Sequence, residues 1–244
     1  MACSRWEHVG VVLGGDRGTG AARPLRHRPR TGLGHLCDHG DGCGGVLCVS
    51  GAGVGDPAVA DLAAIKAAAR TAAFVRRKAA FEIAPQAQTG YLAQVLAGYP
   101  GVPVSGYMAM RTEIDPLPAM VEAAAHGPVG VPVFITKGEA LRFALWEPGC
   151  RMVDGPFKAQ VPAVLDWMTP QILIVPLLTF DGRGGRLGYR GGFYDRTLAG
   201  LRARGPVLAI GFAFAGQEVE AVPTDSTDQH LDLIVTEMNV LTMD

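Results

Sequence analysis

Residues 172–196 read ILIVPLLTFDGRGGRLGYRGGFYDR: an apolar run is followed directly by a segment rich in glycine and arginine. The second part, residues 182–196, holds six glycines and four arginines. The apolar run predicts a strand that is buried on both faces of a parallel sheet. A glycine loop between such a strand and a helix leaves backbone N–H groups free at the helix N-terminus, where an anion can approach them closely. The stretch therefore predicts an α/β fold with an anion-binding loop.

The residue types of the loop suit a polyphosphate with a metal ion. Arginine supplies charge and forked donors for phosphate or carboxylate groups. Asp195 ends the segment with a carboxylate, the hard oxygen ligand that Mg²⁺ prefers. The glycine spacing matches neither G-x-x-x-x-G-K-[ST] nor G-x-G-x-x-G. A glycine-rich surface turn with scattered cations explains the composition equally well, so the residue types alone leave both interpretations open.

A family resemblance decides between them. The segment Arg186-Leu187-Gly188-Tyr189-x-Gly191-Gly192-Phe193-Tyr194-Asp195-Arg196 resembles the signature of the 5-formyltetrahydrofolate cyclo-ligase family, also called the methenyltetrahydrofolate synthetases. The flanks agree, from Ile174-Val175-Pro176 before the signature to Ile234-Val235-Thr236-Glu237 after it. The resemblance spans residues 172–237 and implies an enzyme of one-carbon folate metabolism.

The reaction implied by the resemblance is a ring closure of 5-formyltetrahydrofolate. N10 attacks the N5-formyl carbon, and ATP first phosphorylates the formyl oxygen so that it leaves as phosphate. The products are 5,10-methenyltetrahydrofolate, ADP and phosphate, with Mg²⁺ as cofactor. Phosphoryl transfer depends on positioning and charge neutralisation rather than on a protein nucleophile. We therefore read Cys150 as structural.

The resemblance also implies roles for particular side chains. The expected ATP-binding residues are Lys66, Arg70, Arg186, Leu187, Gly188, Tyr189, Arg190, Gly191, Gly192, Phe193 and Tyr194, of which Arg186 and Arg190 are the catalytic residues. The expected folate-binding residues are Met108, Glu113, Tyr189, Arg190, Gly191, Gly192 and Phe193. The expected metal ligands are Asp195 and Asp228.

Several of these side chains have simpler explanations. Lys66 and Arg70, four residues apart, form a solvated basic stripe on many first helices. Glu113 suits the N-terminus of a following helix, although its carboxylate can also accept two N–H bonds from a 2-amino-pyrimidinone ring. Asp228 alone is typical of a surface loop. For each of them we favour the role that the resemblance implies.

Arg190 stands where the family signature has glycine. If that position needs a positive φ, arginine costs about 1–2 kcal/mol and crowds the phosphate. Alternatively, the guanidinium of Arg190 adds a phosphate contact. Two alternatives to the cyclo-ligase stay open. One is a paralogue that keeps the ATP loop but acts on another substrate, and the other is a catalytically impaired or non-catalytic protein that binds ATP and folate.

The amino-acid composition of the chain argues against certain classes of binding partner. The chain has 244 residues, 48% hydrophobic and 18% charged, with a formal net charge of −1. These values are typical of a globular protein and argue against nucleic acid or an anionic membrane as its main partner. No apolar run approaches the roughly 20 residues of a membrane helix, and residues 1–15 lack the pattern of a secretory signal. We expect a cytoplasmic monomer that acts on small molecules.

The first 58 residues differ from the rest. They hold four of the five cysteines, 14 of the 33 glycines and no lysine. The pattern Cys37-x-His39-x₃-Cys43-x₄-Cys48 lacks the paired C-x₂-C spacing of zinc sites, so a metal site is disfavoured. We expect residues 1–58 to be a low-complexity, disordered extension, or the product of a start codon placed too far upstream. Residues 59–244 form the expected cyclo-ligase-like domain.

Periodicity in this domain predicts alternating helices and strands. Leu62, Ile65, Ala69 and Ala73 share one face of a helix that runs to about Ile83, with Lys66 and Arg70 on a different face. Further helices are expected over 89–96 and 116–126, and strands over 102–108, 129–135, 141–146, 172–176, 207–212 and 231–235. The pattern predicts a three-layer α/β/α fold with an open, mostly parallel sheet. Asp181 and Asp232 are expected to be structural, and Trp146 and Phe157 to belong to the core rather than to a site.

Overall fold

The computed structural model describes residues 57–85, 88–189 and 191–243. The expectations for residues 1–56, including the disfavoured zinc pattern, and for Arg190 lie outside these ranges. The described α-helices are α1 (Pro57–Ile83), α2 (Gly90–Ala97), α3 (Leu117–Ala124) and α4 (Phe193–Arg202). Helices α1, α2 and α3 agree with the three helices expected up to residue 126, and α4 follows the glycine segment.

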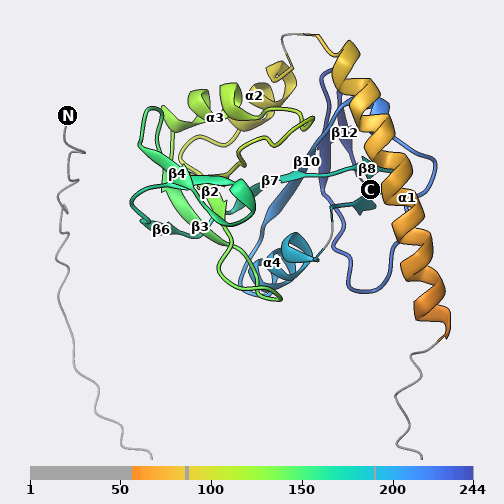
Figure 1. Ribbon diagram of the computed structural model, residues 1–244. Helices are drawn as coiled ribbons and strands as arrows, with labels where there is room; N and C mark the ends of the chain where they lie inside the picture. Colours follow the sequence, from red (N-terminus) through yellow and green to blue (C-terminus); the bar gives the residue numbers. More distant parts are fainter. Residues whose placement is uncertain (1–56, 86–87, 190, 244) are drawn as a thin grey trace, which may run out of the picture. The chain divides into compact units, whose positions relative to one another are not determined.

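Within the described ranges, the largest sheet has eight strands in the order β12-β11-β10-β7-β1-β2-β3-β6 (Figure 1). In chain order these are β1 (Val104–Ser105), β2 (Val129–Val133), β3 (Arg142–Trp146), β6 (Trp167–Met168), β7 (Ile172–Pro176), β10 (Leu208–Phe212), β11 (Leu233–Val235) and β12 (Val240–Thr242). Two small antiparallel pairs accompany it: β4 (Met152–Asp154) with β5 (Gln160–Pro162), and β8 (Thr179–Phe180) with β9 (Arg186–Leu187). Single 3₁₀ turns occur at η1 (Pro156–Lys158) and η2 (Ala215–Gln217).

The centre of the sheet is parallel, as predicted. Strands β11, β10, β7, β1 and β2 run in one direction, whereas β12 and β3 pair antiparallel at the two sides. The chain enters at β1, moves outward to β2, and then returns to β7 on the other side of β1. The strand order therefore reverses between β1 and β7. In open α/β sheets, ligands bind outside the carboxyl ends of the strands at such a reversal.

Side chains alternate between the two faces of the sheet along each strand, so a hydrophobic core forms on each face. Ile172 and Ile174 of β7 point to one face and pack with α2 and α3, while Leu173 and Val175 point to the other and pack with α4. Adjacent strand residues face opposite sides, so an uninterrupted apolar run is what a doubly covered strand requires. In Figure 1, α2 and α3 lie above the sheet and α4 lies below it. The three-layer α/β/α prediction is confirmed.

The strand expected over 102–108 is only two residues long. Val104 and Ser105 pair with both β2 and β7, and the ladder ends at Gly106. A Cβ atom on Gly106 would lie 2.3 Å from the sulfur of Met120 in α3, so the backbone passes close beneath this helix. Beyond this glycine the chain leaves the sheet and runs outward from its carboxyl end.

The predicted apolar face of α1 is buried only in part, because Ala73 is fully buried whereas other members of that face are not. Ile65 is 48% exposed, whereas Lys66 is 8% and Arg77 only 1% exposed. The buried stripe follows residues 66, 73, 77 and 80, a helical repeat of mainly charged and small side chains. In Figure 1, α1 runs past β8 rather than over the sheet, so much of this stripe meets loops that carry polar partners. The solvated-stripe explanation of Lys66 is therefore wrong.

The first glycines of the segment 182–196 form a hairpin turn. Strand β7 does not open directly into a loop, because β8 and β9 pair first. Asp181, 2% exposed, accepts N–H bonds from Arg183 at 3.0 Å, Gly185 at 3.0 Å and Val222 at 2.8 Å. Burial acts to raise the pKa of Asp181, but these bonds outweigh it and hold the pKa below its ordinary value. The structural role expected for Asp181 is confirmed, and Gly182–Gly185 belong to its turn.

We expect Asp181→Ala to lower the free energy of unfolding by about 3 kcal/mol, because three N–H groups lose a buried charged acceptor. The corresponding fall in melting temperature is roughly 6–12 °C for a domain of this size. Urea unfolding at pH 7 measures the change, and Asp166→Ala, at an exposed position, is the control. The difference should vanish as the pH falls through the lowered pKa of Asp181, since the carboxylate stabilises only while ionised. Equal stability of the two variants at pH 7 would contradict this account.

Candidate functional site

Two segments converge where the strand order reverses. Residues 106–113 follow the carboxyl end of β1, and residues 177–192 follow the carboxyl end of β7. The second segment makes the β8–β9 hairpin and then crosses to α4. Because β1 and β7 are hydrogen-bonded neighbours, both segments begin at the same edge of the sheet. Most residues that the sequence singled out lie in these two segments or face them from α1.

The end of the glycine segment is a helix N-terminus without a side-chain cap. Gly191 has φ +96° and Gly192, the N-cap of α4, has φ +60°. A Cβ on Gly191 would also lie 2.7 Å from the ring of Phe193, so both positions favour glycine. No side chain of the described part of the chain caps the first N–H groups of α4, which leaves donors suited to an anion.

The side chains around this terminus differ in what they present. Leu187 is buried in β9, so only its backbone can reach a ligand, whereas a Cβ on Gly188 would meet open space. Phe193 packs edge-on against Phe134 at 5.0 Å, and Tyr194 packs against the core beneath α4. These positions supply backbone groups and apolar walls rather than charge.

Lys66 lies between two carboxylates. Its ammonium group is 2.6 Å from Oδ2 of Asp225 and 2.6 Å from Oδ2 of Asp228. The Lys66 hydrogen bond is the main cause that lowers the pKa of Asp225 well below its usual range. Burial acts to lower the pKa of Lys66, but the two carboxylates outweigh it and raise the pKa. The predicted ATP contact Lys66 and the predicted metal ligand Asp228 thus meet in one charged cluster.

A second ion pair lies beside this cluster. The guanidinium of Arg186, with a side chain 4% exposed, donates to Oδ1 of Asp195 at 2.8 Å and also to the carbonyl of Gln229. The backbone N–H of Gln229 donates to the same Asp195 oxygen at 3.0 Å. Because Gln229 directly follows Asp228, the two predicted metal ligands lie in adjacent parts of one site.

The carboxylates retain oxygen atoms that suit Mg²⁺. Oδ2 of Asp195 and Oδ1 of Asp228 take no hydrogen bond or ion pair from any described residue. No cluster of three or more metal-ligating side chains occurs within the described ranges. Mg²⁺ is commonly held by one or two carboxylates together with substrate phosphates and water. The donor set therefore fits a metal that arrives with a polyphosphate.

Helix α1 holds the glycine segment in place. Nε of Arg70 donates to the carbonyl of Gly188 at 3.1 Å, and Phe74 packs edge-on against the ring of Tyr189 at 5.3 Å. Arg77, one further turn along, stacks over the same ring at 4.9 Å. Lys66 and Arg77 are separated by about 16 Å along the helix axis. One helix thus borders both ends of the site.

The other end of the site surrounds Glu113. Its Oε2 accepts the N–H of Met110 at 2.8 Å, and its Oε1 lies 3.7 Å from Nη1 of Arg77. Burial raises the pKa of Glu113, although the Met110 N–H and Arg77 act in the opposite direction. Met108, the other predicted folate contact, packs with Met120 and its neighbours under α3. The helix-cap explanation of Glu113 receives no support, because Asp115 accepts the N–H of Leu117 at the start of α3.

Three buried polar atoms beside Glu113 make no hydrogen bond with a described residue, although Nη1 of Arg77 and Oε1 of Glu113 form an ion pair at 3.7 Å and both residues act on the pKa of Tyr189. Nη1 of Arg77, Oε1 of Glu113 and the hydroxyl of Tyr189 are buried without a hydrogen bond to any described residue. Buried polar atoms are normally paired, so unpaired ones call for an explanation such as a ligand or water. Together they offer donors and an acceptor, as recognition of a polar ring edge requires.

Sequence reasoning missed two residues of the site. Arg77 lies seven positions after Arg70, and this spacing indicates the same helical face. Asp225 lies three positions before Asp228, within a polar loop.

Trp146 belongs to the core as expected, whereas Phe157 is 71% exposed with φ +61°, so its assignment to the core is wrong. Phe157 packs edge-on against Phe134 at 4.8 Å.

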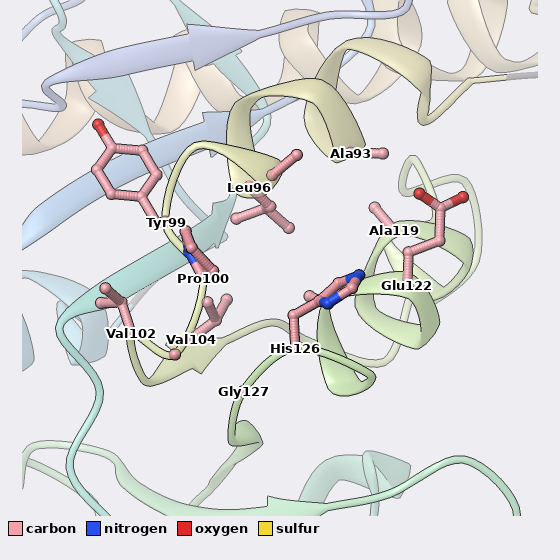
Figure 2. Close-up of a pocket in the computed structure, with 13 residues that line it drawn as sticks. Ala93, Leu96, Tyr99, Pro100, Val102, Val104, Ala119, Glu122, His126 and Gly127 are labelled. Carbon is pink, nitrogen blue, oxygen red and sulfur yellow. The ribbon is translucent and has the colours of Figure 1, made fainter.

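A separate apolar groove of about 290 Å³ lies elsewhere. Figure 2 shows Leu96 of α2 opposite Ala119 of α3 and His126, which follows that helix. Val104, which begins β1, also lines the groove, so it opens toward the amino end of that strand. Glu113 follows the carboxyl end of β1. The groove is therefore separate from the convergent polar groups.

Comparison with known proteins identifies the family. The model of the 5-formyltetrahydrofolate cyclo-ligase family matches residues 106–237. A Haemophilus influenzae protein named 5-formyltetrahydrofolate cyclo-ligase is 39% identical over 95 residues, which cover 38% of this chain and 46% of that protein. An Escherichia coli K12 protein of the same name is 32% identical over 145 residues, covering 56% of this chain and 79% of that protein. The chain thus spans less than half of the first relative and about four-fifths of the second.

Solved structures share the fold. The NMR structure of Aquifex aeolicus 5,10-methenyltetrahydrofolate synthetase superposes with a TM-score of 0.59 at 24% identity, covering 73% of this chain and 93% of that one. The Mycoplasma pneumoniae synthetase gives a TM-score of 0.52 at 18% identity, covering 70% and 98%. Among the described residues, no helix is long and apolar enough to cross a membrane.

Proposed function

Because the chain belongs to the 5-formyltetrahydrofolate cyclo-ligase family, a family of enzymes, we propose that it converts 5-formyltetrahydrofolate to 5,10-methenyltetrahydrofolate. The proposed reaction consumes ATP and releases ADP and phosphate, with Mg²⁺ as cofactor. N10 forms a bond to the formyl carbon, and the formyl oxygen leaves as part of phosphate. The proposal concerns a cytoplasmic, monomeric enzyme whose partners are small molecules.

One observation carries this proposal: two different sets of groups meet where the strand order reverses. The first set, around Lys66, Arg186 and the N-terminus of α4, suits phosphates. The second, around Glu113 and Tyr189, suits a polar aromatic edge. The loop that carries Tyr189 ends at α4, so one short segment borders both sets. A reaction between ATP and a reduced folate needs these two sets side by side.

We assign the phosphate end to positioning and charge neutralisation. Arg186 is nearly buried, so its charge acts on a bound phosphate with little screening by solvent. Lys66 and Arg70 border the same end from α1, and Arg70 also fixes the loop through Gly188. Arg190 occupies the loop position where the family signature has glycine, and its catalytic role stays a prediction. Polyphosphate binding requires Lys66 to exchange a carboxylate partner for phosphate oxygen.

Asp195 and Asp228 are the residues we propose to hold Mg²⁺. Each keeps one carboxylate oxygen that no described residue engages. A bound magnesium ion would neutralise phosphate charge and orient the transferred group. Asp195 also accepts from Arg186, so it keeps this arginine facing the phosphates. Lys66 pairs with both Asp225 and Asp228 and thereby offsets part of their negative charge.

At the folate end, we assign recognition of the pteridine to Glu113. The carboxylate can accept N–H bonds from the 2-amino-pyrimidinone edge, with Oε1 still without a hydrogen bond. Met108 and the ring of Tyr189 are assigned to the apolar faces of the ligand. Phe193 and the flanking glycines complete the boundary with the ATP site.

Purified protein should form the methenyl product, which absorbs in the near-ultraviolet, only when 5-formyltetrahydrofolate, ATP and Mg²⁺ are all present. Omitting ATP, or chelating Mg²⁺ with excess EDTA, should reduce the rate at least about 100-fold, because charge on the phosphates is then left uncompensated. Restoring Mg²⁺ should restore the rate. An inert folded protein, tested beside an active relative, would contradict the proposal. Arg190→Gly would then separate a damaged cyclo-ligase, which regains activity, from a protein with another substrate.

A further inference from the structure

We propose that Arg77 is a positioning residue for folate recognition, because its guanidinium holds both the turn that carries Glu113 and the ring of Tyr189. This inference rests on the proposed function and extends it to a residue outside the family signature. Arg77 would touch Glu113 and Tyr189 rather than the reacting atoms. Its effect should therefore appear in folate affinity before it appears in the chemical step.

The contacts of Arg77 join three separate parts of the chain. Nε donates to Oγ1 of Thr112 at 3.1 Å, and Nη1 lies 3.7 Å from Oε1 of Glu113. The guanidinium carbon lies 4.9 Å from the ring centroid of Tyr189, within the range of a cation–π contact. A planar guanidinium is suited to such simultaneous edge and face contacts, and an ammonium group is not.

The turn that Arg77 holds is strained. Arg111 has φ +58°, a left-handed conformation that is unfavourable for a residue with a Cβ. Inside the turn, the N–H of Glu113 donates to the carbonyl of Met110 at 3.1 Å, and the N–H of Met110 donates to the Glu113 carboxylate at 2.8 Å. Arg77 adds its contacts to Thr112 and Glu113 from outside the turn. A strained turn keeps its shape only when such contacts determine it.

Burial makes a purely structural role for Arg77 costly. The side chain is 1% exposed, and the facing Glu113 side chain is 4% exposed. Apolar side chains of similar volume often stabilise a fold as well as a buried ion pair does. The pair also leaves Nη1 and Oε1 without hydrogen bonds among the described residues. The arrangement therefore holds a carboxylate ready for a polar ligand.

Among the groups around Glu113, Arg77 is also the cation that acts to lower the pKa of this carboxylate. The groups that face this carboxylate are Arg77 from α1, Tyr107 from the segment after β1, Tyr189 from the loop and Tyr194 from α4. Burial raises the pKa of all three tyrosines, so they stay neutral near pH 7. Burial also raises the pKa of Glu113, and Arg77 opposes that rise. Arg77 thus favours the ionised acceptor that folate needs.

The test compares Arg77→Met with Arg76→Met, the neighbouring arginine, for which no hydrogen bond or ion pair with another described residue exists. Binding of 5-formyltetrahydrofolate is measured by calorimetry between pH 5 and 9 in the presence of Mg²⁺ and a non-hydrolysable ATP analogue. We expect Arg77→Met to weaken folate binding about 10–100-fold, as for other residues that orient a ligand-binding group. The pH at which binding is lost on the acid side should rise by about 1–3 units, because Glu113 loses its cation. Affinity for the ATP analogue should change less than about threefold.

Milder variants keep the proposal testable if Arg77→Met does not fold. Arg77→Lys keeps the charge without the fork, and Thr112→Val removes the Nε acceptor; each should weaken folate binding selectively, without the pH shift. Folate affinity and pH dependence like those of the unmodified protein in the folded variants would overturn the proposal. Equal losses of folate and ATP affinity would also overturn it. An unmodified protein that fails to cyclise 5-formyltetrahydrofolate would instead overturn the proposed function.

Discussion

Glu113→Gln is expected to remove most of the affinity for 5-formyltetrahydrofolate while leaving ATP binding nearly unchanged. Glutamine has nearly the same shape and can still accept the Met110 N–H bond, so the turn should persist. It loses the charge and one acceptor, and its amide NH₂ would face N–H donors of the ligand. A charged hydrogen bond contributes about 1.5–3 kcal/mol, so the loss for the pair of bonds should reach at least about 100-fold. Calorimetric titration with folate and with an ATP analogue measures both affinities.

The pH dependence of the unmodified protein gives a second measurement on the same carboxylate. Burial raises the pKa of Glu113, so the ionised form is lost at a higher pH than for an exposed glutamate. Folate binding should therefore be complete well above this pKa and fall as the pH drops through it. Glu113→Gln should show weak binding without that fall. Equal weakening of folate and ATP by the substitution would mean that Glu113 is a structural residue.

The strands were the most predictable part of the fold. Ile172–Pro176 forms β7 over the same residues as expected, because a strand covered on both faces needs an apolar side chain at every position. The helix α1 shows the opposite case. Its buried stripe carries Lys66 and Arg77 because their partners, such as Asp225 and Glu113, come from distant parts of the chain. Periodicity of apolar residues cannot reveal a face whose partners are carboxylates.

The candidate site was predictable where a local motif carries it. The glycine segment pointed to α4 and to Asp195, and the structure places these beside Arg186. The prediction of an anion-binding loop was wrong for the first half of this segment, because Gly182–Gly185 form the hairpin turn around Asp181. That role depends on the Val222 N–H, contributed by a part of the chain 41 residues away. Tertiary hydrogen bonds of this kind leave no local pattern.

Asp195→Asn is expected to keep the fold and lower kcat at least about 100-fold, because it removes a hard oxygen ligand next to the phosphates. The Oδ1 atom of asparagine can still accept from Arg186 and from the N–H of Gln229. The amide nitrogen replaces Oδ2, the oxygen that no described residue engages. Stability should therefore change little, whereas raising the Mg²⁺ concentration should not restore the rate. Steady-state kinetics across a Mg²⁺ series, together with thermal unfolding, separates these two effects.

Asp232→Asn is the matched control, because Asp232 has a similar set of partners but is not itself a proposed metal ligand. It pairs with Arg202 at 2.9 Å and accepts the N–H of Ala209 at 2.7 Å, as Asp195 pairs with Arg186 and accepts from Gln229. Both substitutions remove one charge from an arginine pair, so a loss of activity through weakened ion pairing alone would appear in both. Only Asp195→Asn should change the Mg²⁺ dependence. Full activity with an unaltered Mg²⁺ requirement in Asp195→Asn would exclude Asp195 as a metal ligand and leave it as the structural partner of Arg186 and of the Gln229 N–H.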